Sequence, residues 1–276
     1  MYLTRLQQLA AACLAALSMA NAALAEDLAI PGSGNPEYVL GQLAAAFNKQ
    51  QSAHRVSIPP STGTAGALRD VTAGTASLGR VGRPLKEEER AKGLSYVVVG
   101  RDPVVFAAGA NVTARALTQA QAVGVYSGKI ADWRELDGKP GPIRAIGREA
   151  TDASRQAINR HVKAFESIVF GDNVKLVHLD PQMIELLDRF PTSLGFLNRS
   201  ALSACKTRIV RLALDGVEAT PENLESGRYP LWLELGLIYK PGGLTPAAKA
   251  FLEFVQSAAG SRILREHGVL PALAPR

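Results

Sequence analysis

The sequence predicts an α/β protein in which short strands alternate with helices along the whole chain. Apolar runs of four to eight residues, rich in β-branched side chains, recur at intervals. Most are followed by segments with apolar residues at helical spacing, and turns rich in Gly, Ser and Thr separate three of these pairs. Hydrophobic residues make up 47% of the chain and charged residues 20%, a composition typical of a globular protein. Together these features favour strands and helices packed in layers.

Residues 1–25 are predicted to form a secretory signal. Arg5 is their only charge, residues 6–19 are mostly Leu and Ala, and Ala23-Leu24-Ala25 fits an A-x-A cleavage site. A retained membrane helix is the alternative, but polar residues interrupt a run that barely reaches spanning length. We therefore expect an exported, periplasmic protein that begins near Glu26 and is long enough for two lobes.

The first half of the expected chain alternates strands with turns and helices. Pro36 suits the first position of a helix that places Val39, Leu40, Leu43 and Phe47 on one face. The expected elements are a strand at 28–30, a turn at 31–36 and this helix; a strand at 55–58, a turn at 61–66 and a helix through 68–71; a strand and turn at 78–85; a solvated charged stretch at 86–92; buried strands at 96–99 and 103–108 joined by 100–102; and a short helix within 117–133.

The second half continues the alternation. The expected elements are a strand at 143–147, a polar turn at 148–155 and a helix at 156–165; strands at 174–179 and 194–197 around a helix at 183–187; strands at 208–214 and 229–239; and a final helix at 246–259.

Three strand–turn–helix units present polar turns at helix starts, at 31–36, 61–66 and 148–155. The first amides of a helix lack partners and carry partial positive charge, so such turns attract anions. Arg148 adds a planar cationic fork. Because ligands of α/β folds collect where strands end and helices begin, the three turns together predict an oxyanion pocket.

Other chemistry finds little support in the sequence. His54, His161, His178 and His267 lack metal-ligand spacing, so no metal site is expected. No Gly-x-Ser-x-Gly context or dinucleotide fingerprint is present, so neither an enzyme nor a cofactor is predicted.

Charge and cysteine content exclude two further classes. The net charge of +6 is scattered, without an aromatic-interleaved basic run, which argues against nucleic acid. Cys13 lies in the predicted signal, which leaves Cys205 alone in the exported chain and predicts a small buried side chain rather than a disulfide.

Several segments, in this order, resemble the phosphate-binding proteins of bacterial ABC transporters. The resemblance covers nearly the whole chain after the predicted signal. It rests on 61–68 (STGTAGAL), 78–85 (LGRVGRPL), 126–133 (YSGKIADW), 146–149 (IGRE), 193–196 (SLGF), 215–223 (DGVEATPEN) and 227–230 (GRYP).

This resemblance implies a type II periplasmic-binding-protein fold with two lobes, each a mixed sheet flanked by helices. Residues 26–107 and 206–276 would form the first lobe and 108–205 the second, with crossings near 106–110 and 203–208. Ligand would lie in the cleft, and lobe closure would exclude water. The implied function is capture, without covalent chemistry, of phosphate or a related small inorganic or organic oxyanion by a monomer that delivers it to an ABC permease. The alternative is a sensory or interaction module, paired with a sensor protein, whose anion pocket is degenerate or self-blocked.

The resemblance also implies ligand-binding residues. The family's first phosphate loop matches Ser33, Gly34 and Asn35, its second loop's serine matches Thr64, and its third-loop arginine matches Arg148. The full predicted set is Ser33, Gly34, Asn35, Thr62, Gly63, Thr64, Arg148, Asp152, Ala153 and Ser154.

Two positions depart from the family pattern. Gly82 stands where relatives carry Asp or Ser, and 151–154 replaces a Gly-Ser-Gly-Thr run, so that Asp152 takes the place of a ligand-binding serine. A carboxylate about 4 Å from an anion costs about 4 kcal/mol at an effective dielectric near 20. Asp152 could accept a hydrogen bond from a protonated ligand, cap the helix and fill the anion site itself, or indicate a different ligand. Arg80, Arg83 and Arg155 could compensate its charge, although structural salt bridges are the expected role of each.

Overall fold

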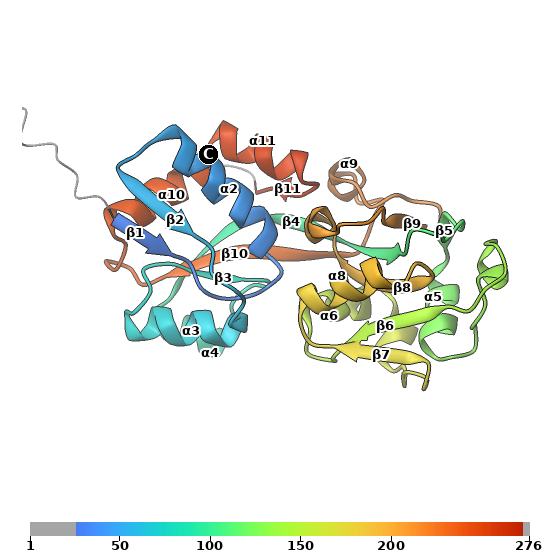
Figure 1. Cartoon of the computed structure of the whole chain (residues 1–276). Helices are drawn as coiled ribbons and strands as arrows, with labels where there is room; N and C mark the ends of the chain where they lie inside the picture. The colour runs from blue at the N-terminus through green and yellow to red at the C-terminus, as the bar shows by residue number, and fades with distance from the viewer. Residues whose placement is uncertain (1–25, 273–276) are drawn as a thin grey trace, which may run out of the picture.

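The computed structural model describes residues 26–272, so the predicted signal at 1–25 lies outside the described part. Figure 1 shows two groups of elements joined by the long strands β4 and β10. Helices flank mixed sheets in both groups, which confirms the predicted fold class. No helix within residues 26–272 is long and apolar enough to cross a membrane.

The strands are β1 (Glu26–Ala29), β2 (His54–Ser57), β3 (Gly79–Val81), β4 (Ser95–Ala108), β5 (Ala116–Leu117), β6 (Arg144–Arg148), β7 (Val174–Val177), β8 (Ser193–Asn198), β9 (Val210–Leu214), β10 (Trp232–Tyr239) and β11 (Leu270–Pro271). The helices are α2 (Glu37–Gln50), α3 (Gly63–Ala73), α4 (Glu87–Arg90), α5 (Gln119–Tyr126), η1 (Trp133–Leu136), α6 (Ala153–His161), α7 (Lys163–Glu166), α8 (Asp180–Arg189), η2 (Arg199–Ala204), α9 (Pro221–Glu225), α10 (Pro246–Gln256) and α11 (Ala258–Glu266).

One strand, β4, runs through both groups of elements within the nine-stranded sheet. Its first part pairs antiparallel with β10 and β11, and its last five residues, 104–108, pair antiparallel with β8, where β9 also joins. The main path of the sheet runs β3-β10-β4-β8-β6-β7, and β1 and β2 form a separate parallel pair. A bridge between Gly32 and Arg80 ties the end of β1 to β3.

Two predictions of local structure are corrected. The expected strands at 96–99 and 103–108 are one strand, because residues 100–102 also pair with β10, and a bulge at Leu235/Gly236 absorbs the register shift. The expected final helix at 246–259 is two helices. Ser257 ends α10 and caps α11, since its Oγ accepts a hydrogen bond from the amide of Gly260 at 3.1 Å.

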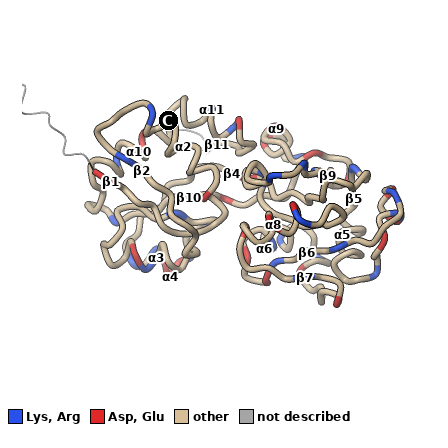
Figure 2. Tube along the Cα trace, viewed as in Figure 1, with Lys and Arg blue, Asp and Glu red and all other residues tan. Residues whose placement is uncertain are grey.

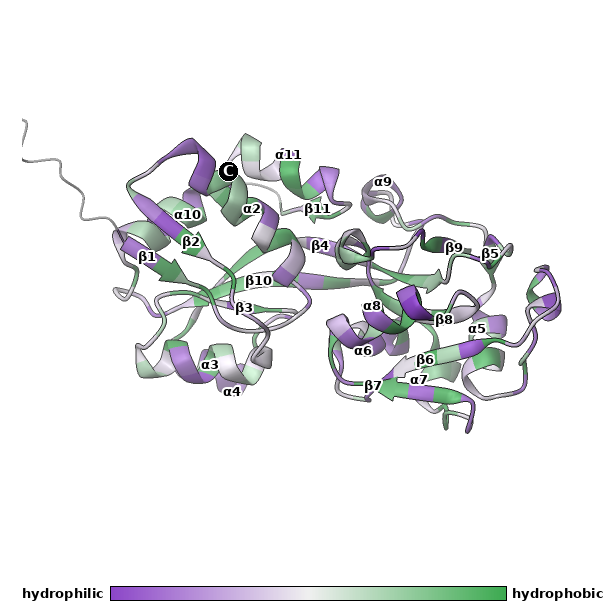
Figure 3. Ribbon diagram, viewed as in Figure 1, coloured by the Kyte–Doolittle hydropathy of each residue, from purple (hydrophilic) through white to green (hydrophobic). Residues whose placement is uncertain are grey.

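Each lobe has an aromatic centre to its core. Phe47 packs edge-on against Phe251 and Phe254 in the first lobe. In the second, Tyr126 contacts Phe106, Phe165, Phe170 and Phe196. Figure 3 shows hydrophobic stretches along β4 and β10 and mixed polarity along helices such as α6 and α8.

The division of the chain between the lobes stays a proposal. β9 pairs with β5 and with the last residues of β4, and both of these partners lie with the second group of elements in Figure 1. We therefore propose that the chain crosses in the middle of β4 and returns just before β10. This places the return later than the 203–208 expected from the resemblance.

Candidate functional site

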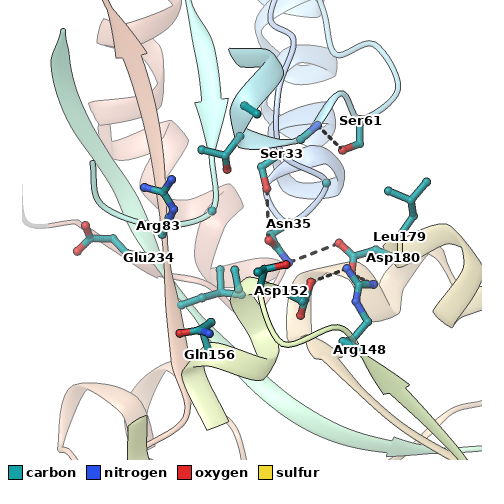
Figure 4. Close-up of a pocket in the computed structure, with 18 of the residues that line it drawn as sticks. Ser33, Asn35, Ser61, Arg83, Arg148, Asp152, Gln156, Leu179, Asp180 and Glu234 are labelled. Carbon is teal, nitrogen blue, oxygen red and sulfur yellow. Dashed lines mark hydrogen bonds and ion pairs between the residues drawn. The ribbon is translucent and has the colours of Figure 1, made fainter. Parts of the chain in front are cut away.

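A cleft of about 820 Å³ lies between the two lobes and holds most of the predicted site (Figure 4). Its first-lobe wall comes from the loop before α2, the start of α3 and the turn after β3. Its second-lobe wall comes from the end of β6, one face of α6 and the start of α8. The lining residues are Ser33, Gly34, Asn35, Ser61, Gly63, Thr64, Ala65, Gly82, Arg83, Pro84, Lys86, Arg148, Thr151, Asp152, Ala153, Gln156, Arg160, His178, Leu179, Asp180, Trp232, Leu233 and Glu234.

Arg80 holds the two first-lobe loops in place. It is fully buried, and its Nε donates to the carbonyl of Ser33 at 2.8 Å. Its guanidinium also donates to the carbonyls of Pro59 at 2.7 Å and Ile30, and pairs with Glu37 at 3.0 Å. One side chain therefore joins both loops that face the cleft.

The first turn of α3 presents backbone donors to the cleft. The amide of Gly63 donates to Ser61 Oγ at 3.2 Å, and Gly63 has a φ of +70°, a conformation that favours glycine. Thr64 and Ala65 follow and line the cleft. First-turn amides have no acceptor within their own helix, so these two are suited to an anion.

Asp152 is the N-cap of α6. Its Oδ1 accepts hydrogen bonds from the amides of Ser154 at 3.0 Å and Arg155 at 3.1 Å, and its Oδ2 accepts one from Arg148 Nη2 at 2.5 Å. Of the roles left open for Asp152 by the sequence, this geometry is that of the cap. Two amides of α6 are therefore already occupied by a protein carboxylate.

Arg148 is shared between two acids. Its Nη1 donates to Asp180 Oδ1 at 3.0 Å, and both side chains are nearly buried. Burial raises the pKa of Asp180 from 3.8 to about 6, although Arg148 opposes the shift, and Asp152 and Glu37 add to it by repulsion. Above that pH, two carboxylates face one guanidinium in the centre of the site.

Asn35 fills the space that the missing side chain of Gly82 leaves. A Cβ at Gly82 would lie 2.6 Å from Asn35 Oδ1 and 3.0 Å from Ser33 Oγ. The hydroxyl of Ser33 also donates to Asn35 Oδ1 at 3.3 Å. At the place in the cleft where a side chain at position 82 would lie, this chain therefore has the polar side chain of Asn35.

The structure brings eight of the ten predicted site residues to one cleft. Thr62 and Ser154 do not line it. Thr62 precedes α3 as its N-cap, and Ser154 is buried with its Oγ 3.5 Å from Asn35 Nδ2. Contact of any of the ten with a ligand remains a prediction.

Sequence reasoning missed Asp180, which is the most consequential residue of the cleft. The turn before it, between β7 and α8, is a fourth strand–turn–helix unit with Pro181 at the helix start. This turn, His178-Leu179, contains none of the Gly, Ser and Thr residues that marked the other three.

The three nearby arginines have structural partners. Arg83 forms a two-point salt bridge with Glu89, both contacts at 2.7 Å. Arg155 lies over the ring of Phe170 at 4.1 Å and donates to the carbonyl of Arg148. Arg80 pairs with Glu37, and none of the three forms a salt bridge with Asp152. The contacts of Arg80 and Arg83 agree with the expected structural salt bridges, whereas Arg155 forms none within the described residues and packs on an aromatic ring instead.

The described part of the chain contains no candidate metal site. Between residues 26 and 272, no group of three or more His, Cys, Asp or Glu side chains could hold an ion. Lys and Arg residues are spread over both lobes in Figure 2.

Comparison with known proteins places these features in a wider group. A family model described as a PBP superfamily domain matches residues 18–259. The phosphate-binding protein PstS of Borreliella burgdorferi is 20% identical over 88% of this chain and 89% of its own length. Among solved structures, a putative phosphate ABC transporter substrate-binding protein from Clostridium perfringens, with bound phosphate, is 25% identical with a TM-score of 0.75 and covers 89% of this chain and 99% of its own. An ABC-type phosphate transport receptor from Vibrio cholerae, 19% identical over 89% of this chain and 100% of its own, shares the fold with a TM-score of 0.62.

Proposed function

The chain belongs to the PBP superfamily, and from that premise we propose that it captures phosphate or a related small oxyanion and delivers it to an ABC permease. It acts by binding, not by covalent chemistry. The relatives named above support this reading over a sensory or interaction module.

The observation that carries the proposal is the convergence of anion donors from both lobes on one cleft. The first lobe contributes the first-turn amides of α3 at Thr64 and Ala65, and the second contributes Arg148. Charge-assisted donors at a helix start are a common anion-binding arrangement. A ligand held between them contacts both lobes and favours their closure.

Asp180 favours a ligand that carries a proton. Its Oδ1 is engaged by Arg148, while Oδ2 has only a 3.5 Å contact with Asn35 Nδ2. That oxygen is free to accept a hydrogen bond from a ligand hydroxyl, which phosphate offers at neutral pH and sulfate does not. One proton shared between Asp180 and phosphate removes the repulsion that two facing charges would produce.

The place of action follows from the same proposal. The predicted signal at 1–25 supports a periplasmic location. We propose that it works as a monomer whose closed form is recognised by the membrane partner.

Calorimetric titration with inorganic phosphate tests the proposal. We expect the wild-type protein to bind at one site and Arg148→Met to bind at least a hundredfold more weakly. Arg144→Met is the matched control, because Arg144 lies on the same strand, is exposed and packs over Phe190 away from the cleft. A wild-type protein that gives no heat, together with an Asp152→Ser variant that binds, would instead establish the self-blocked alternative.

A further inference from the structure

Most of the buried polar side chains of the described region lie in one continuous cluster. It begins in the middle of β4, at the crossing between the lobes, and ends at the cleft. Its members are Asp102, Asn198, Ser200, Asn35, Ser33, Ser154, Asp180 and Arg148. Burying polar groups costs free energy unless each is hydrogen-bonded, so such a concentration calls for a role.

The cluster starts at Asp102, which is fully buried on β4 and forms no salt bridge with another residue of the described part of the chain. Its carboxylate accepts hydrogen bonds from Ser200 Oγ at 2.5 Å, from the amide of Ser200 at 3.2 Å and from Asn198 Nδ2 at 2.8 Å. Asp102 thereby fixes the end of β8 and the start of η2 against the crossing strand.

Asn198 carries the cluster across to the first lobe. Its Nδ2 lies 3.0 Å from the carbonyl oxygen of Asn35, and its Oδ1 lies 3.4 Å from Asn35 Nδ2. Asn35 in turn lies 3.5 Å from both Ser154 and Asp180. The loop that starts α2 is therefore held to the second lobe by contacts on both its backbone and its side chain.

The first three members of the cluster, Asp102, Asn198 and Ser200, do not line the cleft. They reach it only through Asn35. An effect of these residues on ligand binding therefore has to pass through the position of the first-lobe loop.

We propose that Asn198 and Asp102 are positioning residues that hold the Asn35 loop against the second lobe and so set the lobe closure on which anion binding depends. The inference rests on the proposed function for its binding readout. Its structural part, the tie between the crossing strand and the Asn35 loop, stands on the contacts alone.

The test uses Asn198→Leu, which removes the donors and the acceptor in a side chain of similar branching. We expect inorganic phosphate to bind at least tenfold more weakly by calorimetry. We also expect small-angle X-ray scattering without phosphate to show a larger radius of gyration than wild type, because the inter-lobe tie is lost.

Two controls separate this role from a loss of stability. Ser193→Ala lies on the same strand, and within residues 26–272 the buried Ser193 hydroxyl has no hydrogen-bond partner. Asn48→Leu removes two hydrogen bonds to Val56 inside the first lobe. Both should keep wild-type affinity and radius of gyration, even where Asn48→Leu unfolds at lower denaturant.

Asp102→Asn gives a second, independent readout. Burial raises the pKa of Asp102 to about 6, so the native state disfavours its charged form at pH 8, and the neutral asparagine should leave stability at pH 8 equal or higher. We expect phosphate affinity to fall at least fivefold in the same protein, a combination that a purely structural role does not produce.

Affinity within twofold of wild type in folded Asn198→Leu, with an unchanged radius of gyration, would overturn the inference. If wild type itself does not bind phosphate, the proposed function fails, and the scattering comparison alone then decides whether the tie exists. If Asn198→Leu does not fold, the measurements on Asp102→Asn decide. Unchanged phosphate affinity and an unchanged radius of gyration in that variant would count against the proposal.

Discussion

Arg148 forms salt bridges with two carboxylates, those of Asp152 and Asp180. One positive and two negative side chains therefore set the charge that an incoming anion meets. Asp152 is engaged in capping α6, whereas Asp180 keeps one oxygen nearly free. The two acids therefore differ in their contacts: the first stabilises the helix start, and the second presents an oxygen to the cleft. Their removal should have different consequences.

Asp180→Asn tests the protonation of the site. The native pKa of about 6 lies above the ordinary 3.8, so Asp180 is neutral below about pH 6 and charged above it. At pH 8 the charged Asp180 accepts the hydrogen bond from the phosphate hydroxyl and repels an anion without a proton, so Asp180→Asn should reduce the preference of the cleft for phosphate over sulfate at least fivefold at pH 8, with little change at pH 5. Calorimetry with both anions at both pH values decides, and an equal preference in the two proteins at pH 8 would refute this role.

The raised pKa of Asp180 also makes the stability of the protein depend on pH. The native state binds this proton more tightly than the unfolded chain, so the contribution of Asp180 to stability decreases as the pH rises from about 4 to about 6. Binding curves at different pH values should accordingly be compared on proteins shown to be folded at each.

Asp152→Ser tests the cap. Serine retains a capping oxygen, so the free energy of unfolding should fall by only about 1 kcal/mol. The variant releases Arg148 and removes a negative charge from the cleft, so phosphate should bind at least tenfold more tightly at pH 8. Urea unfolding and calorimetry measure the two effects, and weaker binding would mean that Asp152 accepts a hydrogen bond from a protonated ligand.

Residue types near helix starts could be read from the sequence, but their partners could not. Ser33, Thr64 and Arg148 stand out because they follow strands in polar turns. Asp180 follows a turn without Gly, Ser or Thr instead, and its contact with Arg148 joins positions 32 residues apart through the pairing of β6 with β7. Such a contact depends on sheet order, which local patterns do not determine.

At the level of elements, the first-lobe wall of the site consists of loops that the buried side chain of Arg80 holds in place. Arg80 donates hydrogen bonds to backbone carbonyls in the loops before α2 and α3. Burial lowers its pKa, although the nearby Glu37 opposes this shift. A planar fork makes these contacts simultaneously, whereas lysine supplies a point charge with a different reach.

Arg80→Lys should therefore lower the free energy of unfolding by about 3 kcal/mol, the scale of a broken buried ion pair, and weaken phosphate binding as the loops loosen. Arg69→Lys is the control, since the Arg69–Asp70 pair is exposed, and it should leave stability close to that of wild type. Urea unfolding of both variants measures the difference. Similar losses in the two would show that Arg80 does not organise the loops.

Most strands and helices could be predicted from their periodicity, but the continuity of β4 through residues 100–102 could not. The pattern at Gly100-Arg101-Asp102 indicates a turn, yet these residues remain in β4 because β10 and β11 pair along them. A Cβ at Gly100 would lie 2.6 Å from the carbonyl of Leu270, so the glycine allows β11 to approach closely. Tertiary pairing here overrides local signals.

On the scale of the whole molecule, ligand binding between lobes should stabilise the native state by mass action. Phosphate at a hundred times its dissociation constant should add about 2.7 kcal/mol, which raises the melting temperature by about 5–10 °C in a protein of this size. Thermal unfolding with and without phosphate checks this, and Arg148→Met should show no shift. An equal shift in Arg148→Met would place the bound phosphate outside the cleft.

The lobe organisation was predictable in kind from the alternating elements and the family resemblance, but its hinge was not. The buried cluster from Asp102 to Asn35 joins residues distant in sequence, with polar side chains that carry no periodic signal. Only the three-dimensional arrangement brings the crossing strand and the cleft together.

Backbone amide spectra recorded during a phosphate titration test the central claim most directly, because they locate the anion among the donors. The account predicts that the amide protons of Thr64 and Ala65, at the start of α3, shift downfield and saturate at one equivalent of inorganic phosphate. Shifts confined to exposed lysines such as Lys163, with Thr64 and Ala65 unmoved at saturating phosphate, would contradict it.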